Sequence, residues 1–429
     1  MRTARIGAAA GLAMLAAPAA AQPLVVSDSG DTAWILVASA LVLLMTIPGL
    51  ALFYGGLVRA RNVLSVIMHC FVMVCAISLL WAIIGYSLVF GEGDQWIGGT
   101  GNAFLANLAD LRADTTIPES AFALFQMTFA VITPALVIGA FVERIRFGWV
   151  VTFSLFWTLF VYVPVAHSVW GGGWLSSLGV LDFAGGIVVH TTAGIAALVV
   201  AVMLGVRKGF NKTLLPPHSP ALTMAGAGLL WVGWYGFNGG SALAASDDAA
   251  TAILNTHLAA SAAALIWIAL ERIKIGKPTS IGIVTGAVAG LATVTPAAGY
   301  IGPMGAIVLG LLGSLACFYA VLLIKQKLKI DDSLDVFAVH GVGGMLGSIL
   351  LPLFILPALG GAGFEEGNGL ANQLVAQAIG VFIVATWTGL MTWLICFASS
   401  YVTPMRVDEE AEHDGLDLAS HGERGWELD

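Results

Sequence analysis

Two histidines lie in stretches of sequence apolar enough to be membrane spans. His190 sits in GGIVVHTTAGIAALVVAVMLG and His340 in DVFAVHGVGGMLGSILLPLF. An ionisable side chain at such depth is costly in hydrocarbon, so it normally faces a bundle interior or a pore and marks the route of an ion or a proton. A neutral imidazole carries one donor and one acceptor. Two neighbouring imidazoles could therefore pass a proton or align hydrogen bonds to a small polar molecule.

The settings of these two histidines resemble one another. Each follows a β-branched residue and precedes a run of small residues, HTTAGI in one case and HGVGGM in the other. Such a likeness is typical of corresponding positions in the two halves of a duplicated transporter. A lone histidine in a span is more simply explained by a hydrogen bond to a neighbouring helix, and we interpret His69 and His257 in that way.

The elements that position these histidines are predicted to be membrane helices. Hydrophobic residues make up 58% of the 429 positions and charged residues 10%, which argues against a soluble protein. A span needs roughly 20 apolar residues. We expect an all-α polytopic protein with eleven transmembrane helices at about 32–57, 63–90, 119–142, 148–168, 186–206, 220–240, 252–271, 279–300, 303–324, 335–358 and 371–402.

The basic residues give an independent test of this topology, because loops on the cytoplasmic side collect Lys and Arg. Beyond residue 21 only Arg112 falls on one side of the predicted membrane. The other side collects Arg59, Arg61, Arg144, Arg146, Arg207, Lys208, Lys212, Arg272, Lys274, Lys277, Lys325, Lys327, Lys329, Arg406 and Arg424. This distribution predicts a mature N-terminus outside the cell and a C-terminus in the cytoplasm.

The predicted organisation has three parts. Residues 1–21 follow the plan of a cleavable signal peptide, with a short helix that stays attached as the alternative. Residues 22–402 form the membrane domain, in which two inverted five-helix repeats, followed by a final helix, would bring both histidines to a shared interface near the midplane. The tail, 403–429, is either a disordered end or a regulatory element on the cytoplasmic face, and its composition favours neither.

Other residue types add little chemistry by their spacing alone. Asp182, just before the fifth span, could cap a helix or attract a cation. Trp170 could be an interfacial anchor or a cation-π partner. Nucleic-acid binding has no support because no soluble segment carries a basic patch. Catalysis has little, because no nucleophile–base pair or metal-ligand cluster appears by spacing. The cysteines are interpreted as packing residues, at Cys70, Cys75, Cys317 and Cys396.

Six motifs, in order along the chain, closely resemble those of ammonium transporters of the Amt/Mep/Rh family, bacterial Amt type. They are PGLALFYGG at 48–56, ERIRF at 143–147, AHSVWGGG at 166–173, LDFAGG at 181–186, GFN at 236–238 and DVFAVHG at 335–341. The resemblance runs from about residue 31 to the tail.

The resemblance implies a homotrimer in the inner membrane, without a cofactor, and with one pore in each subunit. It also implies a trimeric PII-type regulatory protein that docks on the tail. Its implied site residues are Phe125, Trp170 and Ser241 for recruiting ammonium, Phe129 and Phe237 as a stacked gate, Trp234 in the pore wall, His190 and His340 as twin histidines and Asp182 as support of the outer site. One departure is Gln126-Met127-Thr128, where some members have small residues.

Ammonium and potassium ions are similar in size, so a selective pore must use the N–H donors and the removable proton of ammonium. We therefore hypothesise deprotonation at the outer site, passage of ammonia through an apolar lumen, and proton transfer assisted by the histidines. The alternatives are a neutral pore for ammonia, urea or water, an ammonium sensor without sustained flux, and a haem-carrying electron carrier with the histidines as axial ligands.

Overall fold

The computed structural model describes residues 27–213 and 216–426, so the predicted signal peptide at 1–21 lies outside the described residues. The described part is helical, with three isolated β-bridges and no named strand. Its α-helices are α1 (Ser29–Leu44), α2 (Ala51–Leu57), α3 (Val63–Leu80), α4 (Tyr86–Phe90), α5 (Glu119–Val137), α6 (Phe147–Trp157), α7 (Val163–Trp170), α8 (Trp174–Ser177), α9 (Thr192–Leu204), α10 (Pro220–Gly240), α11 (Asp247–Lys274), α12 (Ser280–Val294), α13 (Pro303–Leu322), α14 (Val342–Phe354), α15 (Leu370–Val402), α16 (Glu409–Asp414) and α17 (Leu416–His421).

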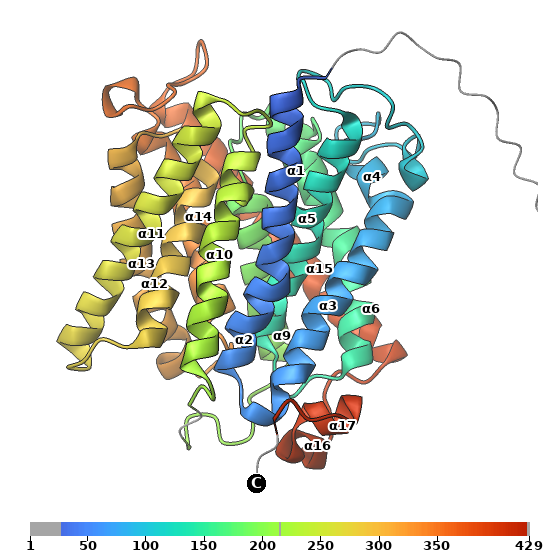
Figure 1. Cartoon of the computed structure of the whole chain (residues 1–429), viewed down its shortest axis with the longest axis vertical. Helices are drawn as coiled ribbons and strands as arrows, with labels where there is room; N and C mark the ends of the chain where they lie inside the picture. The colour runs from blue at the N-terminus through green and yellow to red at the C-terminus, as the bar shows by residue number, and fades with distance from the viewer. Residues whose placement is uncertain (1–26, 214–215, 427–429) are drawn as a thin grey trace, which may run out of the picture.

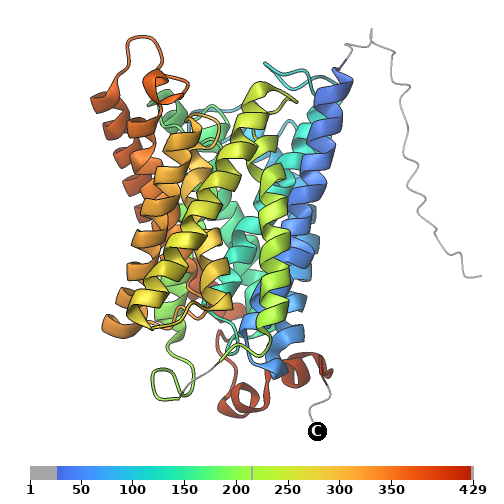
Figure 2. The ribbon, with the colours of Figure 1, turned by 60° about the vertical axis from the view of Figure 1, so that its left-hand side comes forward.

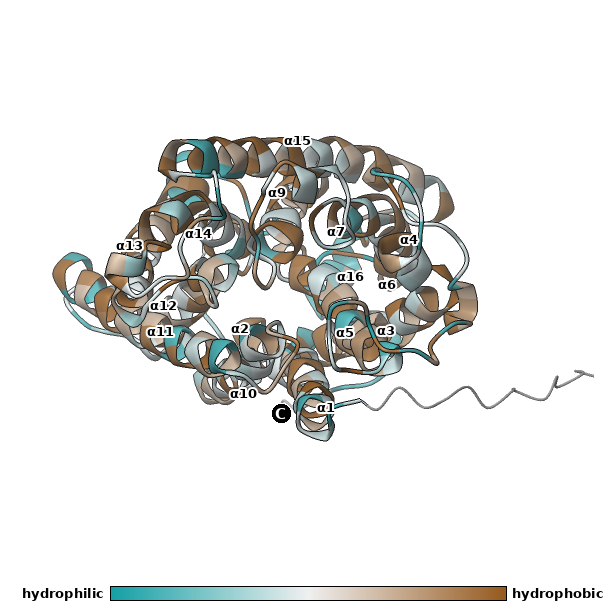
Figure 3. Cartoon of the chain, turned by 90° about the horizontal axis from the view of Figure 1, so that it is seen from above, coloured by the Kyte–Doolittle hydropathy of each residue, from teal (hydrophilic) through white to brown (hydrophobic). Residues whose placement is uncertain are grey.

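The long helices stand side by side in one bundle (Figure 1). Helices α10 to α14 form one side and the helices before α9 form the other, while the tilted α15 runs along one flank (Figure 3). Helix α1 begins at one end of the bundle, here called the upper end, and α16 and α17 lie beneath the opposite, lower end (Figures 1 and 2). Hydrophobic residues cover most of the helices in the view from above (Figure 3).

Ten helical segments in the described residues are long and apolar enough to cross a membrane, which makes the chain a multi-pass membrane protein. They are Ser29–Leu57, Ala60–Phe90, Glu119–Ala140, Phe147–Ser177, Gly186–Leu204, Asp247–Lys274, Ser280–Ala297, Pro303–Lys327, Phe337–Phe354 and Leu370–Val402. The remaining predicted span, 220–240, is helix α10, which is of similar length but is not among the ten, because its glycine, tryptophan and tyrosine residues lower its mean hydropathy. The count of eleven spans, the inverted repeats and the orientation of the termini stay predictions.

Two π-helical turns carry the histidines into the middle of the bundle. Gly186–Thr191 leads into α9, and Phe337–Gly341 leads into α14. Helix α9 and the second turn touch through bare backbone: a Cβ atom on Gly194 of α9 would lie 2.2 Å from the Cα atom of Gly341. Because no larger residue fits this crossing, the glycines set the close approach that brings the histidines together.

Candidate functional site

The histidine pair lies at the centre of the candidate site. The two Nδ1 atoms of His190 and His340 are 3.2 Å apart, and the rings stack with centroids 5.2 Å apart at 19°. The side chains are almost fully buried, at 1% and 4% exposure. A hydrogen bond between two Nδ1 atoms needs one donor and one acceptor, so a single proton occupies the space between the rings. The structure thus brings together the two histidines that the sequence singled out.

Each histidine turn is capped by an aspartate eight residues earlier in the sequence. The carboxylate of Asp182 accepts four backbone hydrogen bonds, of 2.7–2.9 Å, from Gly185, Gly186, Ile187 and Val188. The carboxylate of Asp332 accepts two, from Val336 at 3.1 Å and Phe337 at 2.7 Å. Burial raises the pKa of Asp182 to about 6, and the N–H donors oppose that rise. The structure shows Asp182 as a helix cap, and its attraction for a cation stays a prediction compatible with that cap.

Aromatic rings cover the histidine pair on its upper side. Phe129 and Phe237 stack with centroids 4.3 Å apart at 30°, and Phe237 lies 6.0 Å from the ring of His190. Trp234 stacks on His190 at 5.4 Å, and its indole N–H donates to Thr295 Oγ1 at 2.9 Å. The predicted gate residues are therefore in contact with each other, and Trp234 forms part of the wall beside the histidines.

Three cavities follow one another through the bundle along this line. The upper vestibule, of about 390 Å³, is lined by Phe129 among others. Phe129 contacts Phe237, which lines a narrow lumen of about 10 Å³ together with both histidines. His340 lines both this lumen and the lower vestibule, of about 240 Å³. A space of 10 Å³ admits about one water-sized molecule at a time.

The upper vestibule contains most of the predicted recruitment site. Trp170 and Ser241 line it with Phe129. The Trp170 indole N–H donates to the carbonyl oxygen of Asp182 at 2.8 Å, which fixes the ring at the vestibule wall. The Ser241 hydroxyl donates to the carbonyl of Phe237 at 2.9 Å, so its oxygen lone pairs stay available as acceptors.

Phe125 is the exception to the predicted recruitment site. Its ring is fully buried, packs edge-on against Phe129 at 5.0 Å, and is not among the residues that line the vestibule. It is held there by its tight fit against Gly240, where an added Cβ would come within 2.7 Å of the ring. The structure places Phe125 behind Phe129, so it supports the wall without forming it.

The lower end of the pathway is bordered by a buried network of charges. Arg207 pairs with Glu143 and Asp331, each at 2.9 Å, and Arg59 pairs with Glu143 at 3.0 Å. Burial alone would raise the pKa of both carboxyls, but Arg207 holds the pKa of each below its usual range. Paired in this way, the carboxylates stay ionised and fix the loops around the lower vestibule.

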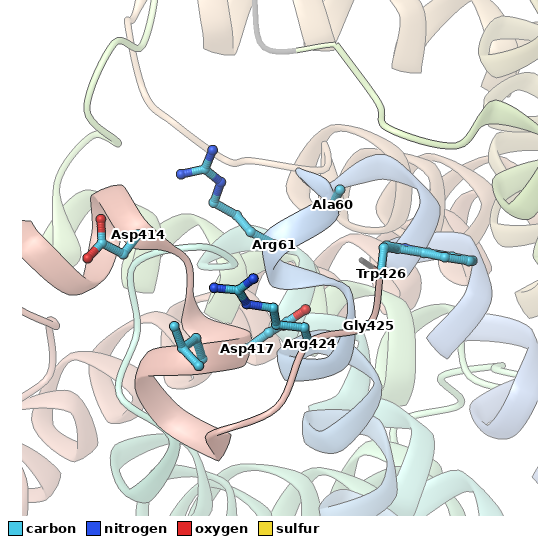
Figure 4. A pocket seen from close by; sticks show the side chains of 8 residues that line it. Ala60, Arg61, Asp414, Asp417, Arg424, Gly425 and Trp426 are labelled. Carbon is cyan, nitrogen blue, oxygen red and sulfur yellow. The ribbon is translucent and has the colours of Figure 1, made fainter. Parts of the chain in front are cut away.

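The tail is folded onto this network. Glu412 in α16 accepts from the backbone N–H of Lys208 at 2.7 Å and pairs with Arg406 at 2.7 Å. Asp417 in α17 accepts from the backbone N–H of Ser65 at 2.8 Å. A pocket of about 220 Å³ lies between the tail and the 3-10 turn before α3 (Figure 4); it is lined by Ala60, Arg61, Asp414, Asp417, Leu418, Arg424, Gly425 and Trp426. Of the two sequence alternatives for the tail, the described residues up to 426 show an element lying on the lower face.

The sequence did not predict a role in the site for Asp332 or Arg112. Asp332 was missed although its spacing to His340 repeats that of Asp182 to His190, which is a signal the sequence contains. Arg112 lines the upper vestibule, and so does Gln126, which the sequence had already singled out as a departure from the family pattern. No sequence signal places Arg112 there, because its loop carries no periodic pattern. Within residues 27–213 and 216–426, no three His, Cys, Asp or Glu side chains are arranged to hold a metal ion.

Known proteins match this chain over nearly its full length. Residues 33–426 match the model of the Ammonium Transporter Family. A putative ammonium transporter of Methanothermobacter thermautotrophicus is 47% identical over 406 residues, 94% of this chain and 99% of the relative. An ammonium transporter of Aquifex aeolicus is 45% identical over 406 residues, 94% of each chain. A solved structure named Sensor Amt Protein superposes with a TM-score of 0.85 at 30% identity, covering 91% of this chain and 98% of that one. These relatives are named for transport or sensing and none for catalysis, and the chain belongs to the ammonium transporter family.

Proposed function

We propose that the chain carries ammonium across the membrane by splitting it into ammonia and a proton. The ion binds in the upper vestibule and gives up one N–H proton above the Phe129–Phe237 stack; the electron pair stays on nitrogen, and the His190–His340 pair is the acceptor to which the proton passes. Ammonia then passes through the lumen, and the proton travels separately along the histidine pair. The single observation that carries this proposal is the hydrogen-bonded pair of buried histidines in a lumen of about 10 Å³.

The geometry of the vestibule supports recruitment of the ion. The faces of Trp170 and Phe129 offer cation-π attraction. The hydroxyl of Ser241 offers an acceptor that favours N–H donors over a spherical potassium ion. An aromatic site with one hydroxyl thus uses a property that distinguishes ammonium from potassium.

The geometry of the lumen supports passage of the neutral species. Its wall is apolar apart from the histidines, so a bare or hydrated ion would lose its solvation there at a high free-energy cost. The imidazole hydrogen bond gives a proton a path that does not need continuous water. Two rings in direct contact also leave no room for a porphyrin between them, which argues against the haem alternative.

Current and uptake measured on one proteoliposome preparation test the mechanism. We expect an inward current that depends on ammonium, together with uptake of nitrogen. Uptake without current would indicate a neutral ammonia pore instead. The absence of both uptake and current would favour a sensor. We expect His340→Ala to abolish the proton-coupled current or to let potassium through. Unchanged rate and selectivity in that variant would contradict the role of the pair.

Assembly and regulation are part of the same proposal. We expect a homotrimer in the inner membrane with the upper end outside the cell, after cleavage at about residue 21, and a PII-type regulator docked at the lower end. The folded tail supports the last point because it presents an ordered surface beside the lower vestibule. Co-purification with the regulator, with and without residues 403–429, tests it; equal recovery in both would remove the tail from the interface.

A further inference from the structure

Arg112 differs in its predicted position from every other basic residue beyond residue 21. It is the one Lys or Arg predicted on the outer side of the membrane. Its side chain lines the upper vestibule, where the proposed cargo is also a cation. A fixed positive charge at that place needs an explanation, because by itself it repels ammonium.

The guanidinium of Arg112 packs over two aromatic rings that line the vestibule. Its Cζ atom lies 4.4 Å from the ring centroid of Phe122 and 5.1 Å from that of Phe90. The two rings meet edge-on with centroids 4.8 Å apart. Both distances fall within the roughly 6 Å over which a ring attracts a cation. Because Phe90 and Phe122 already make cation-π contacts with Arg112, these rings are not available to bind ammonium.

The guanidinium is held in this position by a buried carboxylate. Arg112 Nη1 lies 3.3 Å from Glu119 Oε1, and the hydroxyl of Tyr86 donates to the same oxygen. Glu119 is only 8% exposed. The loop is fixed as well, since the backbone N–H of Arg112 donates to the carbonyl of Ile117 at 3.0 Å. A rigid, planar guanidinium loses little entropy in such a site.

We infer that Arg112 is a specificity-determining residue that acts as a tethered competitor cation. It fills the aromatic site between Phe90 and Phe122 and leaves Trp170 and Phe129 as the single site for ammonium. This inference rests on the proposed function and deepens it. A pore must bind its cargo weakly enough to release it, and a second open aromatic site next to an unpaired Glu119 would hold ammonium, or a larger organic cation, in the vestibule.

Binding of free guanidinium tests the inference directly. Arg112→Gln removes the charge but keeps a donor for Glu119. We expect the purified variant in detergent to bind radiolabelled guanidinium about two- to fivefold more tightly than the wild type, the size of one exposed cation-π contact. In proteoliposomes, guanidinium should inhibit methylammonium uptake by the variant at concentrations that leave the wild type unaffected. Equal affinity of variant and wild type for guanidinium would overturn the inference.

Three further variants complete the experiment. Arg112→Lys keeps a tethered cation and should bind guanidinium weakly, as the wild type does. Arg272→Ala removes an exposed arginine of the lower end and should also behave as the wild type. If Arg112→Gln does not fold, the double variant Arg112→Ala/Glu119→Gln opens the same rings without leaving a buried charge unpaired. The binding measurement needs no flux, so a failure of the proposed function, seen as absent ammonium transport by the wild type, is distinguishable from a failure of this inference.

Discussion

Replacement of Asp182 by alanine should destabilise the protein more than the same change at Asp332. The Asp182 carboxylate serves four backbone N–H groups and the Asp332 carboxylate serves two. A buried donor left without an acceptor costs roughly 1 kcal/mol or more. The free energy of unfolding should therefore fall by about 4 kcal/mol in Asp182→Ala and about 2 kcal/mol in Asp332→Ala.

Thermal unfolding in detergent, followed by loss of the monodisperse elution peak, measures this difference. At about 2 °C per kcal/mol for a large chain, we expect the Tm to fall by about 8 °C and 4 °C respectively. Asp182→Asn keeps one carbonyl oxygen, which can accept from two of the four donors. The Tm of this variant should therefore fall by an intermediate amount. Ammonium uptake should fall with stability in the same order, because the Asp182 cap positions His190. Equal Tm shifts for the two alanine variants would refute the reasoning.

Three further predictions concern the gate, the tail and pH. Phe237→Ala should remove half of the stacked gate and produce a potassium current in the absence of ammonium. A variant that still excludes potassium would contradict the role of Phe237 in the gate. Glu412→Ala should release the tail and speed tryptic cleavage after Arg406 at least about fivefold, whereas the exposed Glu409→Ala on the same helix should not; equal cleavage rates would argue against the docking role of Glu412. Burial raises the pKa of Asp332 from 3.8 to about 7, so its stabilising contribution is complete below pH 3.8 and is lost as the pH rises through 7. The Tm of the wild type relative to Asp332→Asn should fall over that range, and a pH-independent difference would count against the raised pKa.

The sequence by itself determined the membrane character, the partnership of the two histidines and the separation of Arg112 from the other basic residues. These features follow from composition and from matched positions in the chain, because the cost of burying charge in hydrocarbon acts on every residue independently of its neighbours. The aromatic and hydroxyl residues of the predicted site were indicated by the resemblance to the ammonium transporter family and not by composition or spacing.

Only the tertiary structure decided which side chains form the wall of the pathway. Phe125 and Phe129 are four residues apart and so share one face of α5, and that helix is buried on nearly all sides, so its pattern does not indicate which ring reaches the vestibule. Likewise, the positions of Arg112 and of the tail depend on loops without periodicity and on partners far away in the sequence. The packing of the whole bundle determines which side chain of a helix reaches the pathway and which distant loops touch each other. The local sequence predicts neither.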